Sequence, residues 1–257
     1  MLPSRGICTV VVVGRPITTT VQIPRDRRVT ARRPCPAATM EVVPDLSRMR
    51  RDYETRGLRE DDLAPTWVEQ FDRWFTDAVA AELPEPNAVV VATADADGAP
   101  DARIVLMKGY DASGFVFGTN YASAKGAQLA VNPRAALVFP WHALQRQVRV
   151  TGSVERIGDA ASDALWNPRP RGSQLAAVAS VQSTLVDSRE ELADRVRLLD
   201  EQTADGPVPR PATWGGYRVL PRQVEFWQGG KDRLHDRLQF VLDEEEGGGW
   251  IVRRLAP

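Results

Sequence analysis

The chain has 257 residues, 43% hydrophobic and 26% charged, the ordinary composition of a globular protein with one large or two small domains. The net charge of −1 excludes bulk attraction to nucleic acid or an anionic membrane, and no apolar run approaches the ~20 residues of a membrane-spanning helix. Two Cys, both within the first 35 residues, and two His exclude a disulfide-built fold and a structural zinc site, so we expect a cytoplasmic protein without a metal.

Residues 1–39 differ from the rest of the chain in composition. They contain seven Arg and one Asp, with Pro and Gly scattered between short runs of Val and Thr. Three interpretations remain open: a disordered basic tail, a transit peptide, or upstream sequence translated from a wrongly chosen start, with Met40 or Met49 as the true one. We favour the third, because amphipathic helical periodicity is absent. We therefore expect an irregular or disordered extension over residues 1–48 and one domain over residues 49–257.

An amphipathic helix is predicted over residues 66–83. Thr66 and Glu69 have the spacing of a capping box, which marks a helix start. Aromatic residues follow at helical spacing and fall on one face: Trp67, Phe71, Trp74 and Phe75. We interpret this face as core packing.

A series of short strands comes next, joined by turns that contain Asp and Gly, which is typical of an antiparallel meander. Strands are predicted over residues 88–94, 102–108 and 115–119, followed by a short helix over 123–131 and two further strands over 135–141 and 145–157. Residues 159–182 are predicted to be helical, with an interruption at Arg169-Pro170-Arg171.

The last third of the chain begins with a second capping box, Ser188 and Glu191, which opens a helix to about residue 202. A Pro-rich loop follows, and the chain closes with strands over 216–220, 224–227, 234–242 and 250–255. Six to eight short strands with helices outside them predict a mainly β fold with flanking helices, a small antiparallel barrel.

The segment over residues 225–237 is rich in groups that bind ligands. If its last five residues are extended, Arg233, His235 and Arg237 share one face, opposite Leu234 and Leu238. Two guanidinium groups and an imidazole beside a Trp predict an anion site, which could also hold a flat aromatic ring. The alternative is a solvated face of an edge strand.

The motifs of dinucleotide-binding folds, P-loop proteins and α/β-hydrolases are absent. The cations, amides and hydroxyls that remain suit the binding of phosphorylated small molecules. Arg103 and Lys108 are five apart on one predicted strand, so they point to opposite faces and could serve two different anions. Thr119, Ser123 and Lys125 lie in a turn that leads into a helix, where N–H groups and hydroxyls hold phosphate.

Together these segments resemble the pyridoxine (pyridoxamine) 5′-phosphate oxidase family from about residue 50 to the C-terminus. The motifs that carry the resemblance occur in the family's order: RRDY at 50–53, RIVLMK at 103–108, FPWH at 139–142, RPRGSQ at 169–174, FWQG at 226–229, RLHDR at 233–237 and RLAP at 254–257. Any one motif is weak, but the ordered set is highly specific.

The resemblance implies a split β-barrel of the FMN-binding type and a homodimer with FMN at the subunit interface. It implies oxidation of pyridoxamine 5′-phosphate or pyridoxine 5′-phosphate to pyridoxal 5′-phosphate, with O₂ reduced to H₂O₂. The implied cofactor-binding residues are Arg103, Ile104, Val105, Leu106, Met107, Lys108, Gly118, Thr119, Lys125, Gln147, Gln182, Ser183, Trp227 and Arg237. Among these, Arg103 and Lys125 would hold the FMN phosphate.

By the same resemblance, the substrate-binding residues are Arg50, Tyr53, Lys108, Arg169, Ser173, Arg233 and His235. Lys108, Arg169 and Ser173 would take the substrate phosphate. Arg233 and His235 would lie against the pyridine ring as catalytic residues. Arg50 and Tyr53 would belong to a lid.

Three positions depart from the family pattern. Gly118 stands where an aromatic residue is usual, Ala124 where an Arg is usual, and Leu165 where a Tyr that contacts the substrate phosphate is expected. Two alternatives therefore stay open: a split-barrel flavin or deazaflavin reductase acting on another substrate, and a non-catalytic carrier of vitamer phosphates. The intact Arg233-Leu234-His235 motif favours the oxidase.

Overall fold

The computed structural model describes residues 45, 49, 52–53, 56–204, 206–244 and 248–257. The chain divides into two units, residues 1–50 and 51–257, and the fold described below belongs to the second. The predicted extension over residues 1–48 lies almost wholly outside the described residues, as does Arg50. The predicted division of the chain therefore stays a prediction.

Helix α1 (Trp67–Ala80) begins where the capping box predicts, since the Thr66 side chain accepts a hydrogen bond from the Glu69 N–H (3.3 Å). It ends three residues earlier than predicted. Glu82 has a φ of +52°, in the left-handed region, which a continuing α-helix cannot accommodate.

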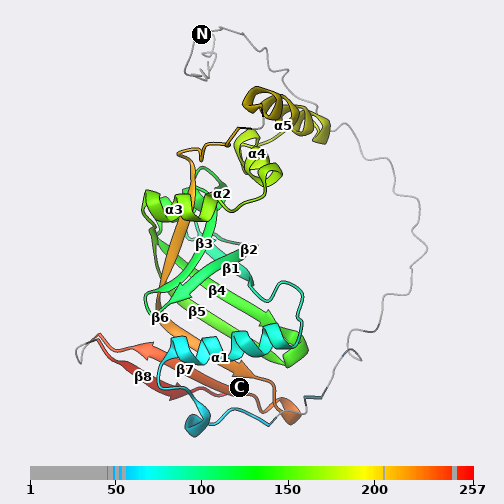
Figure 1. Cartoon of the computed structure of the whole chain (residues 1–257). Coiled ribbons are helices and arrows are strands. Elements are labelled where there is room, and N and C mark those ends of the chain that lie inside the picture. Colours follow the sequence, from blue (N-terminus) through cyan, green and yellow to red (C-terminus); the bar gives the residue numbers. More distant parts are fainter. Residues whose placement is uncertain (1–44, 46–48, 50–51, 54–55, 205, 245–247) are drawn as a thin grey trace, which may run out of the picture. The chain divides into compact units, whose positions relative to one another are not determined.

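Six antiparallel strands of the described chain close into a barrel (Figure 1): β1 (Ala88–Ala94), β2 (Pro100–Asp111), β3 (Gly114–Asn120), β4 (Arg134–Trp141), β5 (Arg146–Arg156) and β6 (Trp214–Gln228). Their order is β3-β2-β1-β4-β5-β6, and pairing of β3 with β6 closes the ring. Strands β7 (Asp236–Leu242) and β8 (Trp250–Arg254) continue the sheet from β6. The predicted antiparallel barrel is confirmed.

Strand β6 is one strand of 15 residues, whereas the sequence predicts two strands over 216–220 and 224–227. Pro221 lies between these two ranges, and proline has no N–H for the ladder. The pairing register with β5 shifts between Thr151 and Gly152, opposite this proline, so an irregularity absorbs it and the strand continues. As a result β6 pairs with β3 near its start and with β7 near its end.

The core lies between α1 and the barrel. The Phe71 ring is fully buried, 4.8 Å from the Phe115 ring and 5.0 Å from the Phe139 ring. Trp74 meets Phe226 edge-on at 5.2 Å. The interpretation of the α1 aromatic face as core is confirmed.

The other helices in the described residues are α2 (Ala124–Val131), α3 (Asp159–Trp166), α4 (Arg171–Ala179) and α5 (Arg189–Thr203), with 3₁₀ turns η2 (Glu60–Asp62), η3 (His142–Leu144) and η4 (Lys231–Arg233). The predicted helical segment over 159–182 is thus two helices, separated at the expected Pro-containing interruption. A second cluster of buried residues joins α3 and α4 to the start of β6: Trp166, Leu175, Val208 and Trp214. In the part of the chain that the structure describes, no helix has the length and apolarity needed to cross a bilayer.

The prediction of an extended segment from Arg233, within a strand that starts at Leu234, is wrong. Strand β7 begins at Asp236, and Arg233 ends the turn η4 with a φ of +67°. Two local hydrogen bonds hold the turn, from Leu234 N–H to the Lys231 carbonyl and from His235 N–H to the Arg233 carbonyl (both 2.9 Å). Leu234 is consequently 73% exposed and does not share the buried face of Leu238.

Candidate functional site

A buried amine lies at the start of α2. The Lys125 Nζ donates to the side-chain oxygens of Gln182 (2.9 Å), Thr119 (3.1 Å) and Ser123 (3.3 Å). Ser123 also caps the helix by accepting from the Gly126 N–H. All three partners of the amine are uncharged, so within the described part of the chain this cation has no carboxylate in direct contact. We call these residues, together with Arg103, the Lys125 cluster.

Arg103 on β2 adds a second positive charge to the cluster. Its guanidinium donates to the Thr93 hydroxyl (2.6 Å) and forms an ion pair with Asp101. Burial lowers the pKa of Lys125, and the nearby Arg103 lowers it further, although Asp101 opposes this effect. Two cations with one carboxylate leave a positive excess in a poorly hydrated place, which fits a phosphate monoester.

A second group of predicted site residues lies on strands β5, β6 and β7, near the end of β6. Gln147 on β5, Trp227 on β6 and Arg237 on β7 are direct register partners, so the three side chains form one row on one face. The His235 ring lies 4.6 Å from the Trp227 ring, and the Tyr53 ring meets both at 5.8–6.0 Å. We call these five residues the Trp227 face.

His235 has a defined hydrogen-bonding state. Its Nδ1 accepts the Gly230 N–H (3.1 Å), so the proton of the neutral imidazole is on Nε2. Burial lowers the pKa of this histidine, and the charge of Arg233 lowers it further. The ring therefore presents an N–H donor rather than a basic nitrogen.

Arg233 lies in a strained loop beside this histidine. Asp232 and Arg233 both have positive φ, at +53° and +67°, a conformation that costs energy for residues with side chains. A Cβ on Gly230 would lie 2.0 Å from the Leu234 carbonyl oxygen, so only glycine fits the loop. The Arg233 side chain is exposed and, within the described residues, makes no hydrogen bond or ion pair.

Arg169, in the link between α3 and α4, stacks on two indoles. Its guanidinium carbon lies 4.9 Å from the Trp214 ring and 5.7 Å from the Trp166 ring, and one of its nitrogens donates to the Ser173 carbonyl (3.2 Å). Its Nε is buried without a partner among the described residues, and burial lowers its pKa. The stacked guanidinium thus keeps N–H groups for a ligand.

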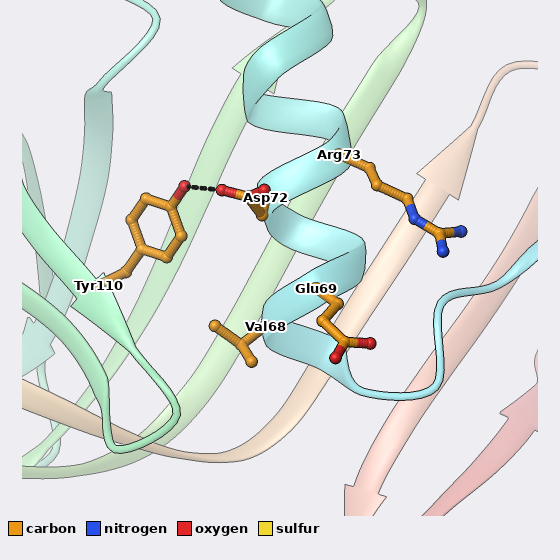
Figure 2. Close-up of a pocket in the computed structure, with 5 residues that line it drawn as sticks. All are labelled: Val68, Glu69, Asp72, Arg73 and Tyr110. Carbon is orange, nitrogen blue, oxygen red and sulfur yellow. Dashed lines mark hydrogen bonds between the residues drawn. The ribbon is translucent and has the colours of Figure 1, made fainter.

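Lys108 is exposed at a bulge in β2, between the paired residues Met107 and Gly109. It lines a surface pocket together with Leu165, Ile157, Arg156 and Arg218, among others. A different pocket, between α1 and β2, contains none of the predicted site residues. Figure 2 shows its lining, where the Tyr110 hydroxyl donates to Asp72 (2.7 Å).

Other predicted residues lie beside these groups. Gly118 on β3 is covered by an indole, because a Cβ there would lie 3.0 Å from the Trp214 ring. In β2, Ile104 is 69% exposed whereas Met107 is buried, and Val105 and Leu106 are half-buried. Ser183 follows α4 and has a φ of +72°.

The Lys125 cluster and the Trp227 face lie at opposite ends of β6. Thr119 pairs with Gly215 near the start of this strand, whereas Trp227 is twelve residues further on. At about 3.3 Å per residue this is roughly 40 Å of strand. One chain does not bring the two groups to one ligand.

Two family models match the chain. Residues 75–202 match the model described as pyridoxamine 5′-phosphate oxidase, and residues 214–257 match the model described as the pyridoxine 5′-phosphate oxidase C-terminal dimerisation region. Curated relatives named pyridoxine/pyridoxamine 5′-phosphate oxidase include one from Salinispora arenicola, 55% identical over 85% of this chain and 99% of that protein. Another, from Rubrobacter xylanophilus, is 52% identical over 83% of this chain and 97% of that protein.

The chain belongs to the pyridoxamine 5′-phosphate oxidase family.

A solved structure supports the fold of this family member. PhzG from Burkholderia lata 383, in complex with tetrahydrophenazine-1-carboxylic acid, is 29% identical, with a TM-score of 0.73 over 79% of this chain and 98% of that one. The predicted family and the predicted split barrel with flanking helices are confirmed.

Sequence reasoning missed three side chains that form hydrogen bonds with the predicted ligand-binding residues Arg103 and Arg237. Thr93 and Gln128 accept hydrogen bonds from Arg103, and Glu225 accepts two from Arg237. The first two come from distant elements and carry no local signal. Glu225 could have been found, because it lies two residues from Trp227 and therefore on the same strand face.

Proposed function

We propose that this chain oxidises pyridoxamine 5′-phosphate and pyridoxine 5′-phosphate to pyridoxal 5′-phosphate, using FMN and O₂. With the amine, water and O₂ are consumed and ammonia and H₂O₂ are released; with the alcohol, O₂ is consumed and H₂O₂ is released. The observation that carries the proposal is the 49–55% identity to curated oxidases over 95–99% of their length. A cytoplasmic location stays a prediction.

The Lys125 cluster would hold the FMN phosphate. Its two cations are matched by one carboxylate, and a bound dianion would supply the missing negative charge. Gln147, Trp227 and Arg237 would contact the flavin, with Gln182 and Ser183 beside the phosphate end. The chemistry that FMN supplies when bound is two-electron oxidation of the substrate carbon, with O₂ as the final acceptor.

The active site would be shared by two copies of the chain. The two groups that are assigned to one FMN are separated by roughly 40 Å of β6 within one chain. A homodimer in which the Lys125 cluster of one protomer meets the Trp227 face of its partner removes this separation. The match of residues 214–257, which include the Trp227 face strands β6 and β7, to a dimerisation region supports this arrangement.

The substrate would be bound by cationic side chains whose N–H groups remain available to a ligand. Lys108 and Arg169, with Ser173, would hold the substrate phosphate. Arg233 would face the pyridine ring, and His235 would donate a hydrogen bond from Nε2 while Gly230 holds its Nδ1. Tyr53 lies against this histidine and would form part of the lid, together with Arg50.

Leu165 lines the pocket next to Lys108, where the family is expected to have a tyrosine hydroxyl. Loss of one such hydrogen bond to a charged phosphate weakens binding by about 1.5–3 kcal/mol. We therefore expect Leu165→Tyr to lower the KM for pyridoxamine 5′-phosphate and to leave FMN affinity unchanged.

The test is an aerobic assay of the purified protein with a flavin spectrum. The protein should take up FMN and release H₂O₂ when pyridoxamine 5′-phosphate is added. Absence of FMN binding contradicts the oxidase proposal. If bound FMN is reduced by another electron donor but not by these substrates, the protein is the reductase. If it binds pyridoxal 5′-phosphate without turnover, it is the carrier.

A further inference from the structure

A buried carboxylate lies beside Trp227 and Arg237 on the same face of the sheet. Glu225 on β6 is only 4% exposed. Its Oε1 accepts the Arg237 Nε–H (2.8 Å), its Oε2 accepts an Arg237 Nη2–H (3.1 Å), and Oε2 also accepts from Arg149 Nη1 (3.1 Å). A buried carboxylate is stable only when its charge is compensated, and here two guanidinium groups compensate it.

The sheet register explains this geometry. Arg149, Glu225 and Gln239 form one row across β5, β6 and β7, and the adjacent row on the same face contains Trp227 and Arg237. Arg237 therefore reaches Glu225 along the diagonal between the rows, which is within reach of a long side chain.

Most of the hydrogen-bonding capacity of Arg237 is used in this way. A guanidinium has five N–H donors. Two of them bind Glu225 as a fork, and Nη1 donates to the Ala256 carbonyl (2.8 Å). The fork also raises the pKa of Arg237. The plane of the group is thus fixed, and one N–H on each terminal nitrogen is left for a ligand.

We propose that Glu225 is a positioning residue for FMN, which acts by holding the Arg237 guanidinium in its binding orientation. This inference rests on the proposed function, in which Arg237 contacts the flavin. Glu225 is buried between Arg237 and Arg149 on this face, and it would act through Arg237 rather than by contact with the cofactor. Arg149 shares the carboxylate but is half-exposed, and no role in binding is assigned to it.

The test is the dissociation constant of FMN, measured by fluorescence titration of the apoprotein. Glu225→Gln keeps the shape of the side chain and removes its charge, so FMN should bind about tenfold more weakly. Arg149→Gln is the matched control, because it removes the other partner of Glu225, and it should stay within about twofold of wild type. Glu225→Asp keeps the charge but shortens the reach, and it should also weaken binding.

The decisive comparison is a double-mutant cycle with Arg237→Gln. If Glu225 acts through Arg237, then Glu225→Gln and Glu225→Asp should change FMN affinity by less than about twofold once Arg237 is absent. An equal loss in both backgrounds would mean a general structural role and would overturn the inference. Unchanged affinity of Glu225→Asp in the wild-type background would overturn it as well. Failure of the wild-type protein to bind FMN would instead contradict the proposed function.

Discussion

The buried amine of Lys125 supports the proposed site for the FMN phosphate through its side-chain chemistry rather than through strand geometry. Its three oxygen partners are neutral, and both burial and Arg103 lower its pKa. A bound phosphate would reverse this effect, because an adjacent anion stabilises the ammonium form. A bound anion would therefore balance the charge of the cluster, and its use as a phosphate site stays a prediction. The structure brings Thr119, Ser123 and Lys125 together, as their sequence spacing indicates.

A first prediction concerns the protonation of His235. We expect its pKa in the folded protein to lie below the ordinary value of 6.5, with Nε2 protonated in the neutral form. The chain has only two histidines, so ¹⁵N-histidine NMR gives two sets of imidazole signals, and His142→Gln assigns them. Protonated Nδ1 in the neutral ring would contradict the assignment of Nε2 as the donor.

The lowered pKa of His235 also predicts how the stability of the protein changes with pH. The unfolded chain takes up the histidine proton near pH 6.5 and the folded chain takes it up at lower pH, so acid favours the unfolded state. Below about pH 6.5 the wild-type protein should therefore lose stability relative to His235→Gln, as measured by urea unfolding at several pH values.

Among the elements, the loop between β6 and β7 contains two residues in a strained backbone conformation, Asp232 and Arg233. Gly229 and Gly230 let the chain pass close to Tyr53 and to the Leu234 carbonyl, and the next residues adopt positive φ. Arg233 is therefore held by the loop backbone rather than by side-chain partners. Such strain persists only where the surrounding structure enforces it.

Gly230→Ala tests this loop. Its Cβ would lie 2.0 Å from the Leu234 carbonyl oxygen, so the loop must move and carry Arg233 and His235 with it. We expect turnover to fall by about tenfold or more, whereas FMN affinity changes little because Trp227 and Arg237 are on strands. Gly249→Ala, where a Cβ meets nothing within 4 Å, is the control. Unchanged turnover in Gly230→Ala would show that the loop geometry is not needed.

The same loop marks the limit of prediction from sequence. Helix α1 and its cap were predicted because a capping box and helical periodicity are local signals. The start of β7 was not, because period-two alternation in residues 233–237 hid a turn that is fixed by hydrogen bonds of the folded backbone. The continuity of β6 past Pro221 likewise depends on its neighbour β5. Residue types identified the candidate ligand-binding residues, but only the folded barrel shows that they separate into the Lys125 cluster and the Trp227 face.

At the scale of the whole molecule, the division of the candidate site is the main consequence of the fold. Strand β6 joins the barrel, through β3, to the extension β7–β8, and it places the two groups at its two ends. An FMN molecule that contacts both groups would therefore need two copies of the chain. A closed twofold dimer would contain two such sites, because each protomer gives its Lys125 cluster to one site and its Trp227 face to the other.

Subunit complementation shows whether one FMN site is built from residues of two protomers. Arg103→Ala and Arg237→Ala homodimers should each bind FMN poorly, because every site lacks one of its two groups. When the two variants are unfolded together and refolded as a 1:1 mixture, half of the dimers should be mixed, each with one intact site, so about a quarter of all sites should regain wild-type FMN affinity and turnover. Recovery of no tight-binding sites, with dimers of mixed composition verified by mass spectrometry, would contradict a site shared between protomers.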